Sequence, residues 1–200
     1  LCGLFAAAAA GVFHMFFRKM LKMFPADRFL SGWYQDIWAS AGALLLAFSR
    51  TLWFHATMTE VYSLHILFSG LLGFFFVRHL MEGKRRDFLM FFGSWGLSFS
   101  NHMLSLIFAP AALVIILKSC RERRFKQAFL PMLIPGALLF MAGLLPYLYI
   151  PIRAAARPAL NWGDPSNFKN FLWLVSGGDF KSQQFLMQAP GIPFTVRTFL

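Results

Sequence analysis

Long apolar stretches separated by short basic loops dominate this sequence. The longest of these stretches are residues 1–17, 37–55, 60–80 and 129–150. Each approaches the roughly 20 residues that an α-helix needs to cross a bilayer. Residues 88–117 are also apolar, but Asn101 and His102 interrupt them, so this stretch predicts a hairpin of two shorter arms. The pattern predicts an all-α fold, a polytopic transmembrane helical bundle.

The composition agrees with a membrane protein. Hydrophobic residues make up 58% of the chain and charged residues only 14%, whereas soluble domains carry roughly 25% charged residues. The formal net charge of +11 comes largely from the loops between apolar stretches, and no basic face interleaved with aromatic residues occurs outside them. The charge therefore indicates a partnership with the lipid bilayer and not with nucleic acid.

The basic loops predict which side of the membrane each segment faces. The three loops comprise residues 18–28, 82–87 and 118–126. Short basic loops remain on the cytoplasmic side, so the turn near residue 60 and the Asn101-His102 tip should both be external. We expect residues 1–150 to form a transmembrane region of about five or six membrane segments. Residues 151–200 should begin an external segment, periplasmic or lumenal.

The two cysteines and the chain ends complete this picture. Cys2 and Cys120 should lie on opposite sides of the membrane, so we expect neither a disulfide nor a cysteine metal cluster. The chain begins at Leu1 inside an apolar stretch and ends at Leu200 without a stop-like tail. We therefore expect it to be a fragment of a longer protein.

Glu60 is a candidate site residue at the external boundary. It precedes the stretch that starts at Val61, so it can act as an N-terminal acid at the positive end of a helix dipole, with Thr59 as the cap. It can also bind a cation, a sugar hydroxyl or Arg50, which lies near the end of the preceding span. Both interpretations remain open, and Tyr62 lies beside Glu60 in the same candidate site.

Asn101 and His102 form the second candidate feature. An amide and an imidazole at a hairpin tip can cap the turn. Alternatively, His102 can bind phosphate or act as an acid, because the pKa of a histidine lies near neutral pH. The other histidines do not make a metal-ligand spacing with it, so no metal ligands are assigned, although use of a divalent metal is left open.

The third feature follows the last span. Arg153 and Arg157 can hold a lipid phosphate through their guanidinium groups, or can simply interact with head groups. Asn161, Trp162 and Asp164 are candidate contacts for a sugar or acceptor. Asp164 is also expected to cap a helix whose first residue is Pro165.

Four short motifs occur in an order that resembles a known family. They are Thr59-Glu-Val-Tyr-Ser-Leu64, Gly96-Leu-Ser-Phe-Ser-Asn-His102, Leu148-Tyr-Ile-Pro-Ile-Arg153 and Pro158-Ala-Leu-Asn-Trp-Gly-Asp-Pro165. They resemble the multi-pass family first defined as domain of unknown function 2723, which includes transmembrane protein 260-like protein O-mannosyltransferases. The resemblance covers most of residues 30–185.

The resemblance implies a C-type glycosyltransferase fold with its active site on the external or lumenal face. It implies a polyprenyl- or dolichyl-phosphate sugar donor and a protein or glycan acceptor, with protein O-glycosylation as one such reaction. The membrane would be the bacterial inner membrane, or the endoplasmic reticulum membrane in a eukaryote. The main catalytic acid of such enzymes lies in the first external loop, which would precede Leu1, so no catalytic residue is assigned.

Two other functions compete with glycosyl transfer. A transporter or a flippase for lipid-linked substrates would line a path with Arg50, Glu60 and His102, but transporters show inverted repeats and polar groups near mid-membrane. No such repeat is visible in this sequence. A non-catalytic scaffold would tolerate changes at all the external polar residues.

Overall fold

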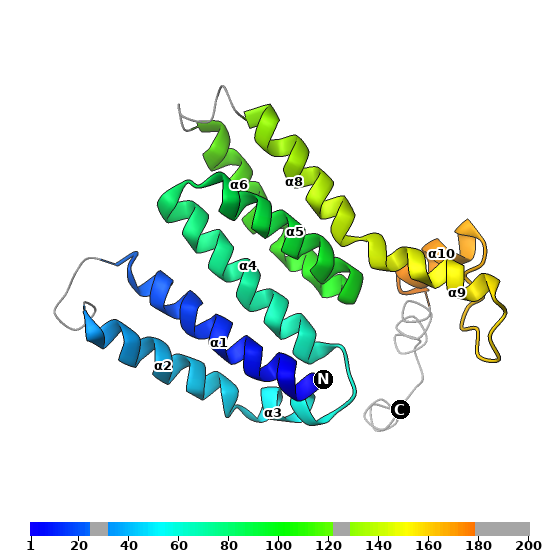
Figure 1. The fold of residues 1–200 in the computed structure, drawn as a ribbon, viewed down its shortest axis with the longest axis horizontal. Coiled ribbons are helices and arrows are strands. Elements are labelled where there is room, and N and C mark those ends of the chain that lie inside the picture. The colour runs from blue at the N-terminus through cyan, green and yellow to red at the C-terminus, as the bar shows by residue number, and fades with distance from the viewer. Residues whose placement is uncertain (25–31, 122–128, 179–200) are drawn as a thin grey trace, which may run out of the picture. The chain divides into compact units, whose positions relative to one another are not determined.

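A computed structural model describes residues 1–24, 32–121 and 129–178, and every regular element in these ranges is helical (Figure 1). The chain divides into two compact units, residues 1–145 and 146–200, and each is described by itself. The first unit contains α1 (Cys2–Leu21), α2 (Trp33–Ala47), α3 (Arg50–Thr57), α4 (Tyr62–Glu82), α5 (Arg85–Asn101), η2 (Met103–Phe108), α6 (Ala109–Arg121) and α8 (Phe129–Gly143). The second contains α9 (Tyr149–Ala155) and α10 (Phe168–Val175), and η3 (Leu145–Leu148) begins at the boundary.

Several of the described helices are long and apolar enough to cross a membrane. Four segments meet this criterion, Cys2–Leu21, Tyr62–Glu82, Met103–Arg121 and Pro131–Ala155, and a bent pair formed by α2 and α3 would make a fifth. With 21 residues, α4 is about 31 Å long at 1.5 Å per residue, close to the ~30 Å hydrocarbon core of a bilayer. The prediction of a polytopic membrane protein built from helices is confirmed.

The second predicted span is not one continuous helix. The chain breaks between α2 and α3, whose axes differ by 56°. Ser49 accepts a hydrogen bond from the backbone N–H of Leu52 at 3.2 Å and thus caps a new helix. Arg50 is therefore the first residue of α3 and is not embedded in a longer helix, which corrects the sequence-based expectation.

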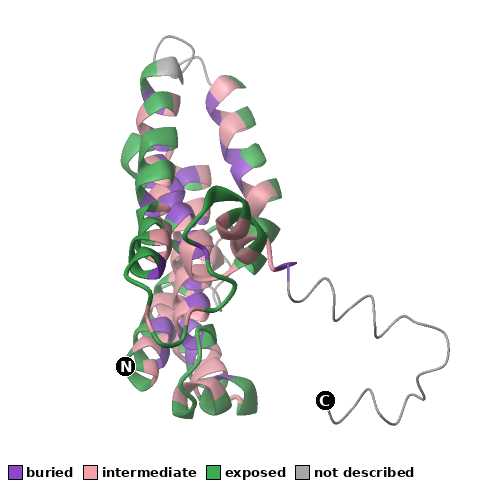
Figure 2. Cartoon of the chain, turned by 90° about the vertical axis from the view of Figure 1, so that its right-hand side faces the viewer, coloured by how far each residue is buried: buried purple, intermediate pink, exposed green. Residues whose placement is uncertain are grey.

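The core of the first unit lies where α4, α5, α6 and α8 meet. Its buried side chains include Leu72, Phe88, Phe91, Ile115 and Met132. Figure 2 shows buried residues on the helix faces that pack against other helices and exposed residues on the outer faces. Many of the outward side chains are large and apolar, and this surface is suited to lipid, in which apolar side chains carry no exposure cost.

Two glycines allow α5 and α8 to cross with their backbones in contact. A Cβ atom on Gly96 would overlap the carbonyl oxygen of Phe140, and one on Gly143 would lie 2.5 Å from the backbone nitrogen of Leu97. Any larger residue at either position would push the two helices apart. Small residues serve the same purpose at many helix crossings in membranes, where close packing replaces the hydrophobic driving force.

Charged residues hold the helix ends together at one end of the first unit. Glu82 forms ion pairs with Lys19 and Lys84, and the buried carboxylate of Asp87 pairs with Arg78 at 2.9 Å. The ammonium group of Lys118 donates to the carbonyl of Leu80 at 2.7 Å. These contacts join α1, α4, α5 and α6 at what we call the basic end.

A buried histidine strengthens the basic end. The Nε2 atom of His79 lies 3.0 Å from the hydroxyl of Ser119, and its Nδ1 atom lies 3.1 Å from the carbonyl oxygen of Lys84. If Nδ1 carries the proton, it donates to this carbonyl while Nε2 accepts from Ser119. The side chain is fully buried, and it connects α4 with α6.

The chain reverses direction at Asn101-His102, between α5 and α6. The first arm, α5, ends at Asn101, His102 makes the turn, and η2 and α6 form the second arm. Buried hydrogen bonds close the turn: the hydroxyls of Ser98 and Ser105 are 2.6 Å apart, and the indole N–H of Trp95 donates to the carbonyl of Ser105 at 2.7 Å.

The last predicted span is interrupted near its prolines. The regular helix α8 contains Pro135 and ends at Gly143, and η3, with Pro146, separates it from α9. A proline cannot donate the backbone hydrogen bond that would continue an α-helix. The regular α-helix is thus interrupted at the short segment that contains Pro146.

Replacing Gly96 with alanine should destabilise the first unit. The added methyl group would force α5 and α8 apart, and overpacking of this kind typically costs about 1–3 kcal/mol. Gly93→Ala is the matched control, because its Cβ would make only an ordinary contact, 3.7 Å from the Cβ of Leu139. Thermal unfolding in detergent measures both variants, and equal stability of the two would show that the close crossing does not matter.

The two ends of the first unit should be accessible from opposite sides of the membrane. With Cys2 and Cys120 replaced by serine, an impermeant thiol reagent added from outside should label Thr59→Cys and Met103→Cys but not Lys84→Cys or Arg121→Cys. The expectation rests on the basic end facing the cytoplasm. External labelling of Lys84→Cys would reverse the predicted orientation.

Candidate functional site

The end of the first unit opposite the basic end collects four of the predicted site residues. The rings of Tyr62 and His102 have centroids 5.3 Å apart. The side-chain amide of Asn101 donates to the carbonyl of Val61 at 3.2 Å, which ties the hairpin tip to the start of α4 beside Glu60. We call this group, with the two histidines described below, the polar cluster.

Glu60 pairs with a histidine that the sequence did not single out. The Nδ1 atom of His55, in the last turn of α3, lies 3.1 Å from the Oε2 atom of Glu60, and the His55 ring packs 4.7 Å from that of Tyr62. The suggested partner, Arg50, is at the other end of α3, which is about 12 Å long for its eight residues. The Glu60–Arg50 pairing is therefore wrong.

The expected cap of α4 is wrong, although Glu60 directly precedes the N-cap and therefore lies beside the positive end of the helix dipole. The N-cap of α4 is Val61, no side chain caps that helix, and its first turn contains no acidic residue. Thr59 likewise does not serve as the cap. The Glu60 carboxylate is thus not committed to the helix end and remains paired with His55 at the surface.

A second histidine completes the polar cluster. The side chain of His65 is only 7% exposed, and its ring centroid lies 5.2 Å from that of His102. Its Nδ1 atom has no hydrogen-bond partner within the described ranges. The spacing of Tyr62 and His65 is i, i+3 on α4, so helical periodicity could have shown that both side chains share one face.

The two ring nitrogens of His102 differ in their contacts. Its Nδ1 atom accepts a hydrogen bond from the backbone N–H of Leu104 at 3.0 Å, so the capping interpretation is confirmed for this atom. Nδ1 must be unprotonated to accept, which leaves the proton of the neutral ring on Nε2. The Nε2 side of the ring is available for other chemistry.

The described residues do not assemble a metal site. No group of three or more histidine, cysteine, aspartate or glutamate side chains is placed to hold a metal ion in these parts of the chain. Cys2 and Cys120 are unpaired, and the thiol of Cys2 donates to the backbone carbonyl of Glu60 at 3.5 Å. Within the described residues, the polar cluster contains a histidine–carboxylate pair, His55 and Glu60, and the hydrogen-bonding groups of Tyr62 and Asn101.

The second unit contains a separate cavity with three predicted site residues. Arg157, Asn161 and Asp164 line a cavity of ≈ 520 Å³, together with Ala154, Ala155 and Ser166. Arg153 lies on α9 and Trp162 in the following loop, and both are exposed and are not among these lining residues. Of the two arginines that the sequence analysis paired, only Arg157 lines this cavity.

Asp164 organises the loop around this cavity. Its Oδ1 atom accepts from the side-chain amide of Asn161 at 2.8 Å and from the hydroxyl of Ser166 at 2.9 Å. Asp164 and Arg157 both adopt positive φ angles, 39° and 49°, which are uncommon for residues other than glycine. Local hydrogen bonds compensate for this backbone conformation at Asp164.

Asp164 does not cap a helix, however. The helix α10 begins at Phe168, and its N-cap is Asn167, whose side chain accepts from the backbone N–H of Asn170 at 2.9 Å. The expected helix start at Pro165 is therefore wrong. A turn precedes this helix, in which the backbone N–H of Asp164 donates to the carbonyl of Asn161 at 3.3 Å.

Replacing Asp164 should loosen the cavity loop. Asp164→Ala removes two accepted hydrogen bonds and places alanine at a positive φ, which together should cost about 1–3 kcal/mol locally. Asp164→Asn should cost less, because asparagine keeps an acceptor oxygen and tolerates this conformation. Hydrogen exchange of residues 157–166 measures the difference, and identical exchange in the two variants would contradict the role of the carboxylate.

Comparison with known proteins gives this arrangement a family context. Residues 1–124 match the family model described as "Protein O-mannosyl-transferase TMEM260 N-terminal domain". The chain is 34% identical over 178 residues to the mouse protein "Protein O-mannosyl-transferase TMEM260", covering 86% of this chain and 23% of that protein. The chain thus spans about a quarter of the length of this relative. No solved structure matches the chain.

Proposed function

Because this chain belongs to the family defined by the TMEM260 N-terminal domain, we propose that it forms part of a membrane glycosyltransferase. The enzyme would transfer mannose from a polyprenyl- or dolichyl-phosphate donor to a hydroxyl group of a protein acceptor, on the external or lumenal face. The relative's name supplies the sugar and the kind of acceptor. The lipid-phosphate donor is inferred from the multi-span architecture and from the resemblance in the motifs.

The observation that carries this proposal is the pairing of His55 and Glu60 within the polar cluster. When a carboxylate holds a proton on Nδ1 of an imidazole, the Nε2 atom is left free to accept a proton. Transfer of a sugar to a hydroxyl requires such an acceptor, because the hydroxyl loses its proton as its oxygen bonds to the sugar carbon. The negative Glu60 carboxylate would stabilise the protonated imidazole.

We assign a supporting role to the polar cluster. The cluster would bind the acceptor hydroxyl and assist removal of its proton, beside a main catalytic acid of the kind that the resemblance implies. Tyr62, Asn101 and His102 supply hydroxyl, amide and imidazole groups of the kind that orient sugars and alcohols. Neutral hydrogen-bonding groups at fixed positions serve this purpose well because little reorganisation is needed.

Arg157 is the better candidate for the donor phosphate in the second unit. Its side chain lines a cavity with polar walls, whereas Arg153 does not line it. A guanidinium group can bind two phosphate oxygens at once, and its charge would stabilise the phosphate as the bond to the sugar breaks. Asn161 and Asp164 would contact sugar hydroxyls in the same cavity.

Substitutions in the polar cluster should separate chemistry from capping. We expect Glu60→Gln and His102→Asn, made in the full-length protein, each to reduce mannose transfer at least about tenfold, as for loss of a positioned acid–base group. Asparagine can still accept from the N–H of Leu104, so His102→Asn should preserve folding. Thr59→Ala, in the same external turn, is the control. Wild-type transfer in both variants would leave His102 with capping alone.

Substitution of Arg157 tests the donor site. Arg157→Lys keeps the charge but loses the planar fork, so the KM for the lipid-linked donor should rise while the KM for the acceptor stays unchanged. Arg153→Ala should have the smaller effect of the two arginines, and Lys169→Ala, an exposed change in the same unit, should have none. A rate-against-donor-concentration series in vesicles measures all three, and a larger effect of Arg153→Ala would move the phosphate to that residue.

A further inference from the structure

The second unit carries a patch of exposed apolar side chains. Leu160, Trp162 and Phe168 are 93%, 75% and 74% exposed, and Leu172 and Trp173 on α10 are exposed as well. Phe168 and Leu172 are spaced i, i+4, so they lie on one face of this eight-residue helix. We call these five residues the aromatic patch. Large apolar side chains that gather at a surface mark a place where a protein meets a membrane or another molecule.

Two contacts fix the aromatic patch to the loop that carries the Arg157 cavity. The side-chain amide of Asn170, on α10, donates to the backbone carbonyl of Asp164 at 2.9 Å. A Cβ atom on Gly163 would lie 3.3 Å from the ring of Trp173, so this ring packs directly against the loop. The surroundings of the patch therefore decide where the cavity lies.

The patch begins close to the end of a membrane span. The segment Pro131–Ala155 is long and apolar enough to cross a bilayer, and Leu160 follows its last residue after a short stretch of chain. An extended chain covers at most about 3.5 Å per residue, so Leu160 lies within roughly 18 Å of the end of the span. The residues after this span are expected on the external side, which places the patch near the external surface of the membrane.

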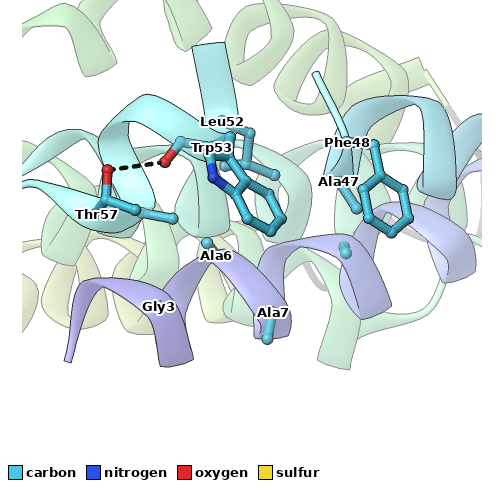
Figure 3. A pocket seen from close by; sticks show the side chains of 10 residues that line it. Gly3, Ala6, Ala7, Ala47, Phe48, Leu52, Trp53 and Thr57 are labelled. Atoms are coloured by element: carbon cyan, nitrogen blue, oxygen red, sulfur yellow. Dashed lines mark hydrogen bonds between the residues drawn. The ribbon is translucent and has the colours of Figure 1, made fainter. Parts of the chain in front are cut away.

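The chemistry of the patch differs from that of an apolar surface within the membrane spans. In the first unit, a groove of ≈ 360 Å³ between α1 and the bent pair α2–α3 is lined by small residues and by aromatic rings such as that of Trp53 (Figure 3). The hydroxyl of Thr57 in this lining already donates to backbone carbonyls of its own helix. The lining includes no charged residue, as suits the hydrocarbon core of a bilayer. The aromatic patch instead contains two indoles and surrounds a lysine, Lys169.

Lys169 favours a bilayer surface over a protein partner for the patch. It is exposed, and its i, i+4 spacing to Trp173 places it on the same side of α10 as the patch. A protein that covered the patch would have to bury or pair the ammonium group, which is costly. At a bilayer surface, the stem of a lysine lies among apolar groups while its charge reaches water and phosphate. Tryptophan is likewise enriched at membrane–water boundaries.

We propose that the aromatic patch inserts into the polar–apolar boundary of the external leaflet and holds the Arg157 cavity at head-group depth. The partner of this surface is the bilayer itself, with the indoles and Lys169 at the boundary and the other side chains below it. The role of the cavity rests on the proposed function, whereas the membrane contact does not. At this depth the cavity meets the phosphate of a lipid-linked donor where that phosphate already lies.

Spin labels distinguish lipid, water and protein as the surroundings of the patch. In full-length protein whose other cysteines are replaced by serine, a single nitroxide is attached at Leu160→Cys, Phe168→Cys or Ser166→Cys, and the protein is placed in bilayer nanodiscs. Oxygen dissolves in lipid, whereas a nickel–EDDA complex stays in water, so the ratio of the two collision rates reports the surroundings of each label. Ser166 is the matched control, because it is exposed in the same loop and lines the cavity.

We expect the oxygen-to-nickel collision ratio at residues 160 and 168 to exceed that at residue 166 at least about tenfold, because a polar complex is strongly disfavoured in apolar surroundings. Low collision rates with both reagents at residues 160 and 168 would show that protein covers the patch. Ratios equal to that at residue 166 would show that the patch lies in water. Either of these results would overturn the proposal.

A second measurement separates the membrane contact from the proposed activity. Leu160→Ser combined with Phe168→Ser leaves every cavity-lining residue unchanged, so it should raise the KM for the lipid-linked donor severalfold without changing kcat. An unchanged KM would contradict the role of the patch in holding the cavity. If the labels report lipid but the protein transfers no mannose, the proposed function fails while the membrane contact stands. If transfer occurs and the labels report water, the function stands and the patch is not a membrane anchor.

Discussion

The contact between the backbones of α5 and α8 is the constraint on which the first unit depends. At Gly96 and Gly143 the two helices approach so closely that neither position can accept a side chain. This crossing lies within two turns of the Asn101-His102 tip, so it determines how α5 delivers that tip to the polar end. A helix pair separated by ordinary side chains would place the same turn elsewhere relative to α4.

The two ends of the first unit are held by different kinds of interaction. At the basic end, ion pairs and a buried histidine join four helices, and most of these groups satisfy one another. At the other end, the contacts among His55, Glu60, Tyr62, His65 and His102 are mainly ring packing and one carboxylate pair. The polar cluster therefore retains hydrogen-bonding capacity that the basic end has already used, as a binding site requires.

The periodicity and charge pattern were sufficient to predict the helical membrane fold. They were not sufficient for the side-chain pairs. The break at Ser49 turns α3 away from α2, so Arg50 is separated from Glu60 and His55 is brought to it. Serine favours helix N-caps, but Ser49 lies inside an apolar stretch, so the hydrophobic pattern alone did not indicate a new helix there.

The start of α10 in the second unit also could not be predicted from the sequence alone. Asp164 and Asn167 are both residues that favour helix N-caps, and only the hydrogen bonds of the folded loop decide that Asn167 takes this role. Arg157 and Asp164, which line the cavity, have positive φ angles that the local sequence does not predict. The four residues proposed near the hairpin, in contrast, needed only the alignment of two helix ends to come together.

The buried histidine of α4 has a consequence for the way this protein is made. His79 enters the membrane region with a ring nitrogen whose partner, Ser119, is synthesised forty residues later. The contact between His79 and Ser119 can therefore form only after α6 has been made and packed against α4. The polar turn at Asn101-His102 is thus already made before this contact at the basic end can form.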